Sequence, residues 1–303
     1  MESLLVLFVY NRDKILKKCI ETLFNNTSYK FDEILLINDG STPEVTKNLM
    51  QFCLQNHNVE QPQFTLLNFG KNQGYGYTAE IAFNYMRWRN PKYVFFIEQD
   101  YIFRADWAKE ATDVLKARSK TIAISGYCNP DFFNKEKTDV IFPQIIKDDF
   151  GSDPCKREFM YKPFDLETES GLIEVQGSSN SCGMSILNWQ WIKFFSEKFP
   201  DFWKKVIERS CNKQPGGNRR YFGDGPFSHG LSWYWYQYYN ENKDEVDFSK
   251  DFPWLDICDF SISSHKNGMG LNGMIAPEGQ TFVESPRWRE EFLNGNPRLC
   301  GKL

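Results

Sequence analysis

The sequence predicts an α/β fold in which a mostly parallel, Rossmann-like sheet is flanked by helices. The first observation is that apolar runs typical of strands buried on both faces alternate with segments of helical periodicity through residues 3–125. The second is that short polar clusters follow three of the strands directly, at 38–41, 71–74 and 98–100. Strands joined by crossover helices bring their carboxyl ends to one edge of a sheet, so these clusters are expected to line one shared crevice.

The pattern places each element of the first half. Strands are predicted at residues 4–10, 31–37, 64–69, 93–97 and 121–126, and helices at 15–23, 44–54, 77–88 and 106–117. The second helix is entered through Ser41-Thr42-Pro43, and proline suits the first turn of a helix.

The alternation of strands and helices stops after residue 126. Residues 127–170 are expected to be irregular, with short strands at best, and 257–280 to be rich in loops. Helices are expected at 189–203, interrupted at Pro200, and at 226–239, which is strongly aromatic. Because no repeat or low-complexity linker divides the chain, residues 127–303 are interpreted as an elaboration packed on the first half.

Composition and charge exclude several classes of protein. Apolar residues make up 41% and charged residues 25%, the balance of a globular protein, and a net charge of −4 gives no overall attraction to nucleic acid or membranes. The eight cysteines lack the close pairs that a structural zinc site uses. With neither a secretory signal nor a transmembrane anchor in view, we expect a cytoplasmic protein with free thiols.

The acidic triplet Glu98-Gln99-Asp100 is the strongest chemical signal. Its two carboxylates follow a buried strand and can both face the crevice if the chain leaves the strand after Glu98. Carboxylate oxygens suit Mg²⁺ or Mn²⁺, which keep positions open for water and phosphate oxygens. The triplet is therefore a candidate metal site, although acidic residues after a strand are also common on solvated surfaces.

Taken as an ordered set, the segments at the strand ends resemble family 2 of the GT-A glycosyltransferases. The set comprises Asn11-Arg12, residues 37–41, Asn72-Gln73-Gly74 and the acidic triplet, and the resemblance covers about residues 3–125. It implies an inverting hexosyl- or pentosyltransferase that moves a sugar from a nucleotide-diphosphate sugar, with a UDP-sugar favoured, to an acceptor hydroxyl. The cofactor would be Mn²⁺ or Mg²⁺.

The resemblance also implies a fold of the GT-A type and a different role for each half of the chain. Residues 1–126 would form the nucleotide-sugar-binding half, and 127–303 the acceptor-binding and catalytic half of the same domain. A C-terminal loop of the second half would close on the donor.

Several residues of the first half take roles from this resemblance. Asp39 would accept hydrogen bonds from the donor's base or ribose, with Asn11 and Lys71 also near the nucleotide. Asp100 would bind the metal, and Glu98 the ribose or a metal-bound water; aspartate is usual at the first acidic position, so glutamate is a departure. The alternatives are that Asp39 merely forms a turn and that Lys71 is solvated. We expect Asp39→Ala to weaken nucleotide binding and leave the fold intact.

The second half supplies two further candidates. Gly177 lies in a stretch, 176–184, that resembles the border of the donor sugar, where small residues let the backbone approach a ligand; an ordinary Gly/Ser loop is the alternative. Asp224, before the aromatic helix, matches the position of the general base that removes the acceptor proton. It would equally serve as a helix cap.

A late polar loop carries the last two candidate site residues. His265 resembles an additional metal ligand that several GT-A enzymes supply from such a loop, and its nitrogen would favour Mn²⁺. Lys266 could neutralise the leaving diphosphate. An ordinary surface loop is the alternative for both.

The segment 198–220 is locally basic, with seven basic residues against two acidic ones and a net charge of +5. Such a run is commonly a solvated face. The sharper hypothesis is an anionic acceptor, either a lipid-linked glycan on a phosphorylated carrier or a nucleic acid with a hydroxylated base.

Two rival functions use the same fold. A sugar-phosphate nucleotidyltransferase would need an early glycine-rich triphosphate loop, which residues 10–13 do not provide. A non-catalytic carbohydrate-binding protein on a decayed fold would have no need of Asp39, Asp100, Asp224 and His265.

Overall fold

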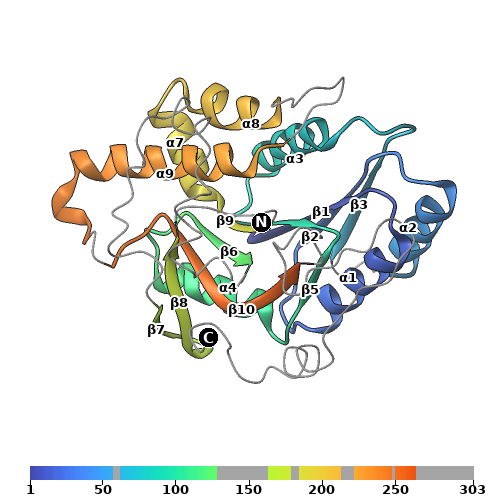
Figure 1. Ribbon diagram of the computed structural model, residues 1–303, viewed down its shortest axis with the longest axis horizontal. Coiled ribbons are helices and arrows are strands. Elements are labelled where there is room, and N and C mark those ends of the chain that lie inside the picture. Colours follow the sequence, from blue (N-terminus) through green and yellow to red (C-terminus); the bar gives the residue numbers. More distant parts are fainter. Residues whose placement is uncertain (57–61, 128–162, 179–183, 213–221, 248–249, 264–303) are drawn as a thin grey trace, which may run out of the picture.

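A mixed ten-stranded sheet with helices on both faces forms the centre of the computed structural model (Figure 1). The structure describes residues 1–56, 62–127, 163–178, 184–212, 222–247 and 250–263. The strand order is β3-β2-β1-β4-β9-β6-β10-β8-β7, and β5 pairs with β10. This architecture confirms the predicted α/β fold class.

Every strand and helix predicted for the first half is present within a few residues of its expected bounds. These elements are β1 (Ser3–Val9), α1 (Asp13–Asn25), β2 (Glu33–Asn38), α2 (Pro43–Asn56), β3 (Gln63–Asn68), α3 (Tyr75–Arg89), β4 (Tyr93–Glu98), α4 (Trp107–Ala117) and β6 (Ala123–Tyr127). Strands β3, β2, β1 and β4 are parallel neighbours, and their register places Val9 beside Asn38 and Phe8 beside Glu98. The ends of β1, β2 and β4 therefore meet at one edge, as predicted.

The second half adds its strands to the same sheet. Its elements are β7 (Pro163–Thr168), β8 (Gly171–Ser178), β9 (Ser185–Asn188), α7 (Trp189–Lys198), a π-helical turn (Trp203–Glu208), α8 (Arg209–Cys211), α9 (Asp224–Glu241), a 3₁₀ turn (Lys243–Glu245) and β10 (Trp254–Ser263). Strand β9 lies antiparallel between β4 and β6. Short β5 (Tyr101–Phe103) follows the acidic triplet directly.

One expectation for the second half was wrong. Residues 257–263, expected to be rich in loops, belong to β10, which lies inside the sheet between β6 and β8. Polar residues such as Asp256 and Ser261 interrupt the apolar pattern that would indicate a strand here. The strands that pair with β10 lie far away along the chain, so local sequence does not reveal them. Residues 163–168, in a segment expected to be irregular with short strands at best, form a short strand that pairs with β8.

Alternate side chains of β4 pack into the two helical layers. Phe95 faces α4, with its ring 5.5 Å from that of Trp107. Phe96 faces the opposite layer, where it stacks on Phe83 at 5.3 Å and contacts Phe222 at 5.6 Å. In Figure 1 the layer on the Phe96 side contains α3, α7, α8 and α9. Much of the aromatic content is thus core, and no helix in the described ranges is long and apolar enough to span a membrane.

One buried acid in this sheet gives the first testable prediction. Asp256 lies in β10 beside Ser125 and Gln176, and the Gln176 Nε2 group donates to its Oδ2 at 3.2 Å. Burial raises the pKa of the Asp256 carboxyl from 3.8 to about 7, while hydrogen bonds from Gln176, Ser178 and Ser125 oppose the rise. A pKa raised on folding means that the native state gains stability when the group is protonated, and this stability is lost as the pH rises from about 4 to about 7.

We therefore expect Asp256→Asn to stabilise the fold at pH 8 by a few kcal/mol, since each pKa unit corresponds to about 1.4 kcal/mol. The gain should shrink as the pH is lowered toward 4, where the wild-type carboxyl is protonated in both states. Urea unfolding of both proteins at pH 5 and pH 8 measures the difference. An effect of the same size at both pH values would show that Asp256 does not titrate in this range.

Candidate functional site

A pocket of about 260 Å³ opens at the edge of the sheet where β1, β2 and β4 end. Its apolar floor is made by Phe8, Val9 and Ile37, and its polar walls come from the segments that follow these strands and from the start of α3. Three residues predicted from the sequence, Asp39, Glu98 and Asp100, line it together. Two of the three polar clusters expected to share a crevice, 38–41 and 98–100, therefore meet at this pocket, whereas no residue of 71–74 lines it.

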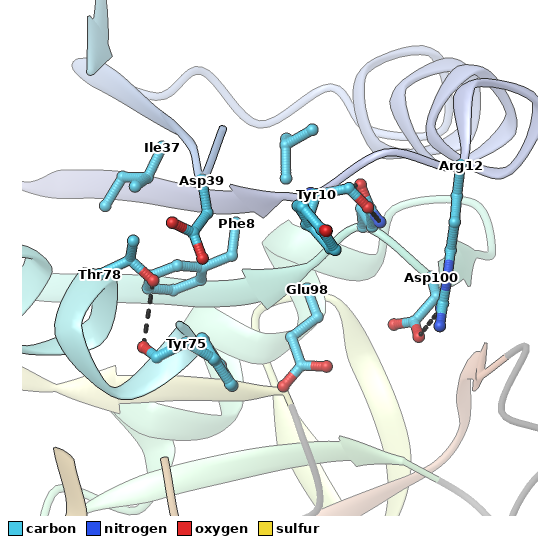
Figure 2. A pocket seen from close by; sticks show the side chains of 11 residues that line it. Phe8, Tyr10, Arg12, Ile37, Asp39, Tyr75, Thr78, Glu98 and Asp100 are labelled. Carbon is cyan, nitrogen blue, oxygen red and sulfur yellow. Dashed lines mark hydrogen bonds and ion pairs between the residues drawn. The ribbon is translucent and has the colours of Figure 1, made fainter. Parts of the chain in front are cut away.

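The charged groups are spread along the pocket. Figure 2 shows Asp39 near Phe8 and Thr78 toward one end and Asp100 beside Arg12 at the other, with Glu98 between them. A ligand with a hydrogen-bonding group at one end, and at the other a group that carries or binds a cation, would fit this distribution.

Asp39 holds the loop before α3 in place. Its Oδ1 accepts the Gln73 backbone N–H at 2.7 Å, and its Oδ2 accepts the Gly74 N–H at 3.0 Å. Gly74 has a φ of 91°, a left-handed conformation that suits glycine. Asp39→Ala would leave these two N–H groups without their acceptor, so we expect the change to destabilise this loop as well as to weaken nucleotide binding. Carboxylate oxygens have additional lone pairs, so Asp39 can still accept a hydrogen bond from a ligand.

Gln99 ties the acidic triplet to the end of β1. Its Oε1 accepts the Tyr10 N–H at 3.1 Å, and its Nε2 donates to the Tyr10 carbonyl at 2.7 Å. The side-chain amide thereby replaces the strand pairing that ends at Glu98. Sequence reasoning missed this role; the signal was a glutamine with both donor and acceptor between two residues expected to face the crevice.

Arg12 is a second residue whose role the sequence did not reveal. Its Nη1 lies 3.4 Å from Asp100 Oδ2, in an ion pair where the Asp100 side chain is 4% exposed and the Arg12 side chain 34%. Arg12 was only part of the resemblance; the structure makes it the cation of the pocket wall.

Tyr10 supplies an aromatic face at the pocket. It is 41% exposed, one of the few large apolar residues left accessible among those described, and it lines the pocket between the two charged ends. An exposed tyrosine beside polar groups can stack on a planar ligand. No sequence signal separated it from the apolar strand that it follows.

The acidic end of the pocket fits a hard divalent cation. Mg²⁺ and Mn²⁺ are commonly held by one or two carboxylates together with water and substrate phosphates. Glu98 and Asp100 offer two carboxylates on one wall, while the described residues contain no cluster of three or more His, Cys, Asp or Glu that could hold a metal by itself. The donor set therefore suits a cation that a bound phosphate helps to hold.

Three other predicted contacts lie outside the pocket lining. The side-chain oxygen of Asn11 accepts the Thr42 N–H at 2.9 Å, which ties the loops after β1 and β2 together. Gly177 lies within β8, where a Cβ would be 2.7 Å from the Phe252 ring. A hydrogen bond within the protein thus accounts for Asn11, and packing accounts for Gly177. Lys71 is exposed next to the site, and its carbonyl accepts from Gln73 Nε2 at 3.2 Å.

Asp224 is the first residue of α9, and the residue two positions before it packs against the pocket. Phe222, two residues earlier, packs its ring 5.3 Å from that of the pocket residue Tyr75. The N-cap of α9 is Gly223, so the alternative that Asp224 is the capping residue is wrong. His265 and Lys266 lie outside the described residues, as does the end of the basic segment.

Comparison with known proteins identifies a sequence family for this chain. The sequence model of Glycosyl transferase family 2 matches residues 5–167, more than half of the chain. Similar solved structures include a mannosyltransferase from Pyrobaculum calidifontis in complex with GDP-Man and Mn²⁺, with 12% identity, a TM-score of 0.42, and coverage of 64% of this chain and 46% of that chain. Another is S. aureus TarS 1–349 in complex with UDP, with 12% identity, a TM-score of 0.42, and coverage of 77% and 64%.

This chain thus spans less than two thirds of either structure, and no curated protein matches it. The family match begins in β1 and extends past the acidic triplet, so it includes every strand end that forms the pocket. The chain belongs to glycosyl transferase family 2.

Proposed function

We propose that this glycosyltransferase binds a nucleotide-diphosphate sugar along the pocket and transfers the sugar, with inversion, to an acceptor hydroxyl. The observation that carries the proposal is the placement of Asp39 and Asp100 at opposite ends of one pocket, with Glu98 between them. A nucleotide has its base and its diphosphate at opposite ends, which matches this spacing of functional groups.

The donor would lie with its base toward Asp39 and its diphosphate toward Asp100. Asp39 would accept a hydrogen bond from the base or ribose, and Tyr10 would stack on the base. Glu98 and Asp100 would hold a divalent cation, Mn²⁺ or Mg²⁺, which would neutralise charge that develops on the diphosphate. Charge neutralisation is the main requirement when a diphosphate leaves.

Asp224 is proposed as the general base. It would remove the proton from the acceptor hydroxyl while the hydroxyl oxygen attacks the anomeric carbon from the side opposite the diphosphate. The new glycosidic bond forms as the bond to the diphosphate oxygen breaks, and the nucleoside diphosphate leaves with the bonding electrons. Its position at the start of α9, two residues after the anchored Phe222, supports this role. His265 and Lys266 remain proposed contacts to the cation and the diphosphate.

The acceptor is proposed to be anionic, with the segment 198–220 as its contact. Part of this positive charge is already compensated, because Lys198 pairs with Glu241 at 3.5 Å and Lys205 with Asp201 at 2.7 Å. Lys204 remains exposed beside them. A phosphorylated lipid carrier and a nucleic acid offer the same charge, and transfer assays with each would separate them.

The second testable prediction concerns donor binding. We expect Tyr10→Ala to weaken binding of the cognate nucleoside diphosphate by about 5- to 150-fold, since stacking of a base on an aromatic ring contributes about 1–3 kcal/mol. The Tyr10 hydrogen bonds to Gln99 use only its backbone, so the fold should remain intact. Calorimetric titration with UDP, GDP, ADP and CDP in the presence of Mn²⁺ measures the loss.

Trp88→Ala is the matched control, because Trp88 is 70% exposed on α3 and lies outside the pocket lining. It should bind the nucleotide as wild type does. Equal affinity of the Tyr10 variant and wild type would remove Tyr10 from the donor site.

A further inference from the structure

We propose that Arg12 competes with the divalent cation for Asp100, so that cation and donor bind cooperatively. This inference rests on the proposed function and extends it to a residue for which the family resemblance supplied no role.

The loop between β1 and α1 holds two consecutive non-glycine residues in the left-handed conformation. Asn11 has a φ of 54° and Arg12 a φ of 56°. A non-glycine residue in this conformation is unfavourable and persists only where surrounding contacts determine it. Here the Asn11 N–H donates to Ser41 Oγ at 2.8 Å, and the Arg12 carbonyl accepts the first intrahelical bond, from Leu16 N at 2.9 Å. The structure thus stabilises an unfavourable backbone that fixes where the Arg12 side chain starts.

The helix gives no reason for a cation at this position. Arg12 is the N-cap residue of α1, and its side chain makes no capping hydrogen bond. The N-terminus of a helix carries partial positive charge, so a guanidinium there is repelled rather than stabilised by the helix. The guanidinium instead forms a favourable ion pair with Asp100 at 3.4 Å.

The Asp100 carboxylate cannot bind the Arg12 guanidinium and a divalent cation at the same time without repulsion between the two positive charges. The Asp100 side chain is almost fully buried, which strengthens each charge interaction because water screens it poorly. A divalent cation at Asp100 would be repelled by the Arg12 guanidinium 3.4 Å from Oδ2, so the arginine weakens cation binding while no donor is present.

Arg12 also lines the pocket where the diphosphate is proposed to lie. When the donor arrives with its cation, the guanidinium can leave Asp100 and bind phosphate oxygens, a geometry that arginine suits well. The donor thereby removes the obstacle to the cation, and each ligand raises the affinity for the other.

The test measures binding of two ligands separately, because the proposal predicts shifts of opposite sign. Arg12→Gln removes the charge and keeps most of the side-chain length. Without nucleotide, we expect this variant to bind Mn²⁺ several-fold to tenfold more tightly than wild type, as measured by electron paramagnetic resonance of free Mn²⁺. With Mn²⁺ saturating, we expect it to bind the nucleoside diphosphate, UDP or GDP, several-fold more weakly in calorimetry.

Two controls accompany the variant. Arg12→Lys keeps a positive charge and should retain most of the competition. Lys17→Gln removes an exposed charge from α1 that pairs with Asp13, outside the pocket lining, and should change neither affinity. General damage to the loop would lower the affinity for both ligands and would not raise the affinity for Mn²⁺.

Unchanged or weaker Mn²⁺ binding by a folded Arg12→Gln protein would overturn the competition. If wild type binds neither Mn²⁺ nor any nucleoside diphosphate, the proposed function itself fails, and this inference with it. If wild type binds both while the variant shows no opposite shifts, only the role of Arg12 fails.

Discussion

Replacing Asp100 with asparagine is expected to lower sugar transfer by about a hundredfold or more. The substitution keeps the size of the side chain but removes the charge that would hold the cation, and a Lewis-acidic cation contributes several kcal/mol to a reaction of this kind. The loss should appear in the release of nucleoside diphosphate from the donor, measured with and without added Mn²⁺. Higher Mn²⁺ should restore part of the activity, because Glu98 remains on the same wall of the pocket.

Asp113→Asn provides a matched control for the loss of a buried carboxylate. Asp113 lies in α4, where its carboxylate pairs with Lys109 at 2.7 Å and Lys116 at 3.3 Å, away from the pocket lining. The control should lose some stability and keep its activity. Full activity of Asp100→Asn, or full activity of wild type in excess chelator, would show that no cation at Asp100 takes part.

Asp224→Asn carries the other large expected effect. Proton removal by a positioned carboxylate contributes roughly 10²–10⁴ in rate, so turnover should fall by that factor, while affinity for the nucleoside diphosphate stays near that of wild type. Stability should change little, because a carboxylate in the first turn of a helix contributes only about 0.3–1 kcal/mol. Steady-state turnover, calorimetry and thermal unfolding of the same preparation measure the three quantities.

Glu44→Gln is the control for the loss of a first-turn carboxylate. Glu44 is exposed in the first turn of α2 and does not line the pocket. It should reproduce the small stability change and leave turnover unaltered. If Asp224→Asn keeps most of its turnover, Asp224 contributes only to the start of α9, and the base must be another acid near the acceptor.

The strand ends of the first half could be predicted because their signals are local. An unbroken apolar run such as residues 4–9 specifies a buried strand, and a polar cluster that follows it specifies where the strand ends. Once the order of strands and helices is known, the meeting of Asp39 and Asp100 at one edge follows from the parallel topology.

The remaining features depend on partners distant in sequence. Strand β10 was missed because Asp256 is polar, and its place in the sheet is determined by Ser125 and Gln176, each far away along the chain. Asp39 also depends on distant partners, because the backbone N–H groups that donate to it lie 34 and 35 residues later in the chain. Gln99 likewise reaches back 89 residues to Tyr10. Periodicity does not report contacts of this kind, which exist only once the sheet is assembled.

The central claim is that this pocket turns over a nucleotide-sugar donor. The most direct measurement is the release of nucleoside diphosphate from a panel of UDP-, GDP-, ADP- and CDP-sugars, with Mn²⁺, with Mg²⁺ and with chelator. We expect release from the sugars of one nucleotide, dependent on a divalent cation and lost in Asp100→Asn. Release of pyrophosphate from a nucleoside triphosphate and a sugar phosphate, or a donor that binds in the pocket and is never turned over, would contradict it.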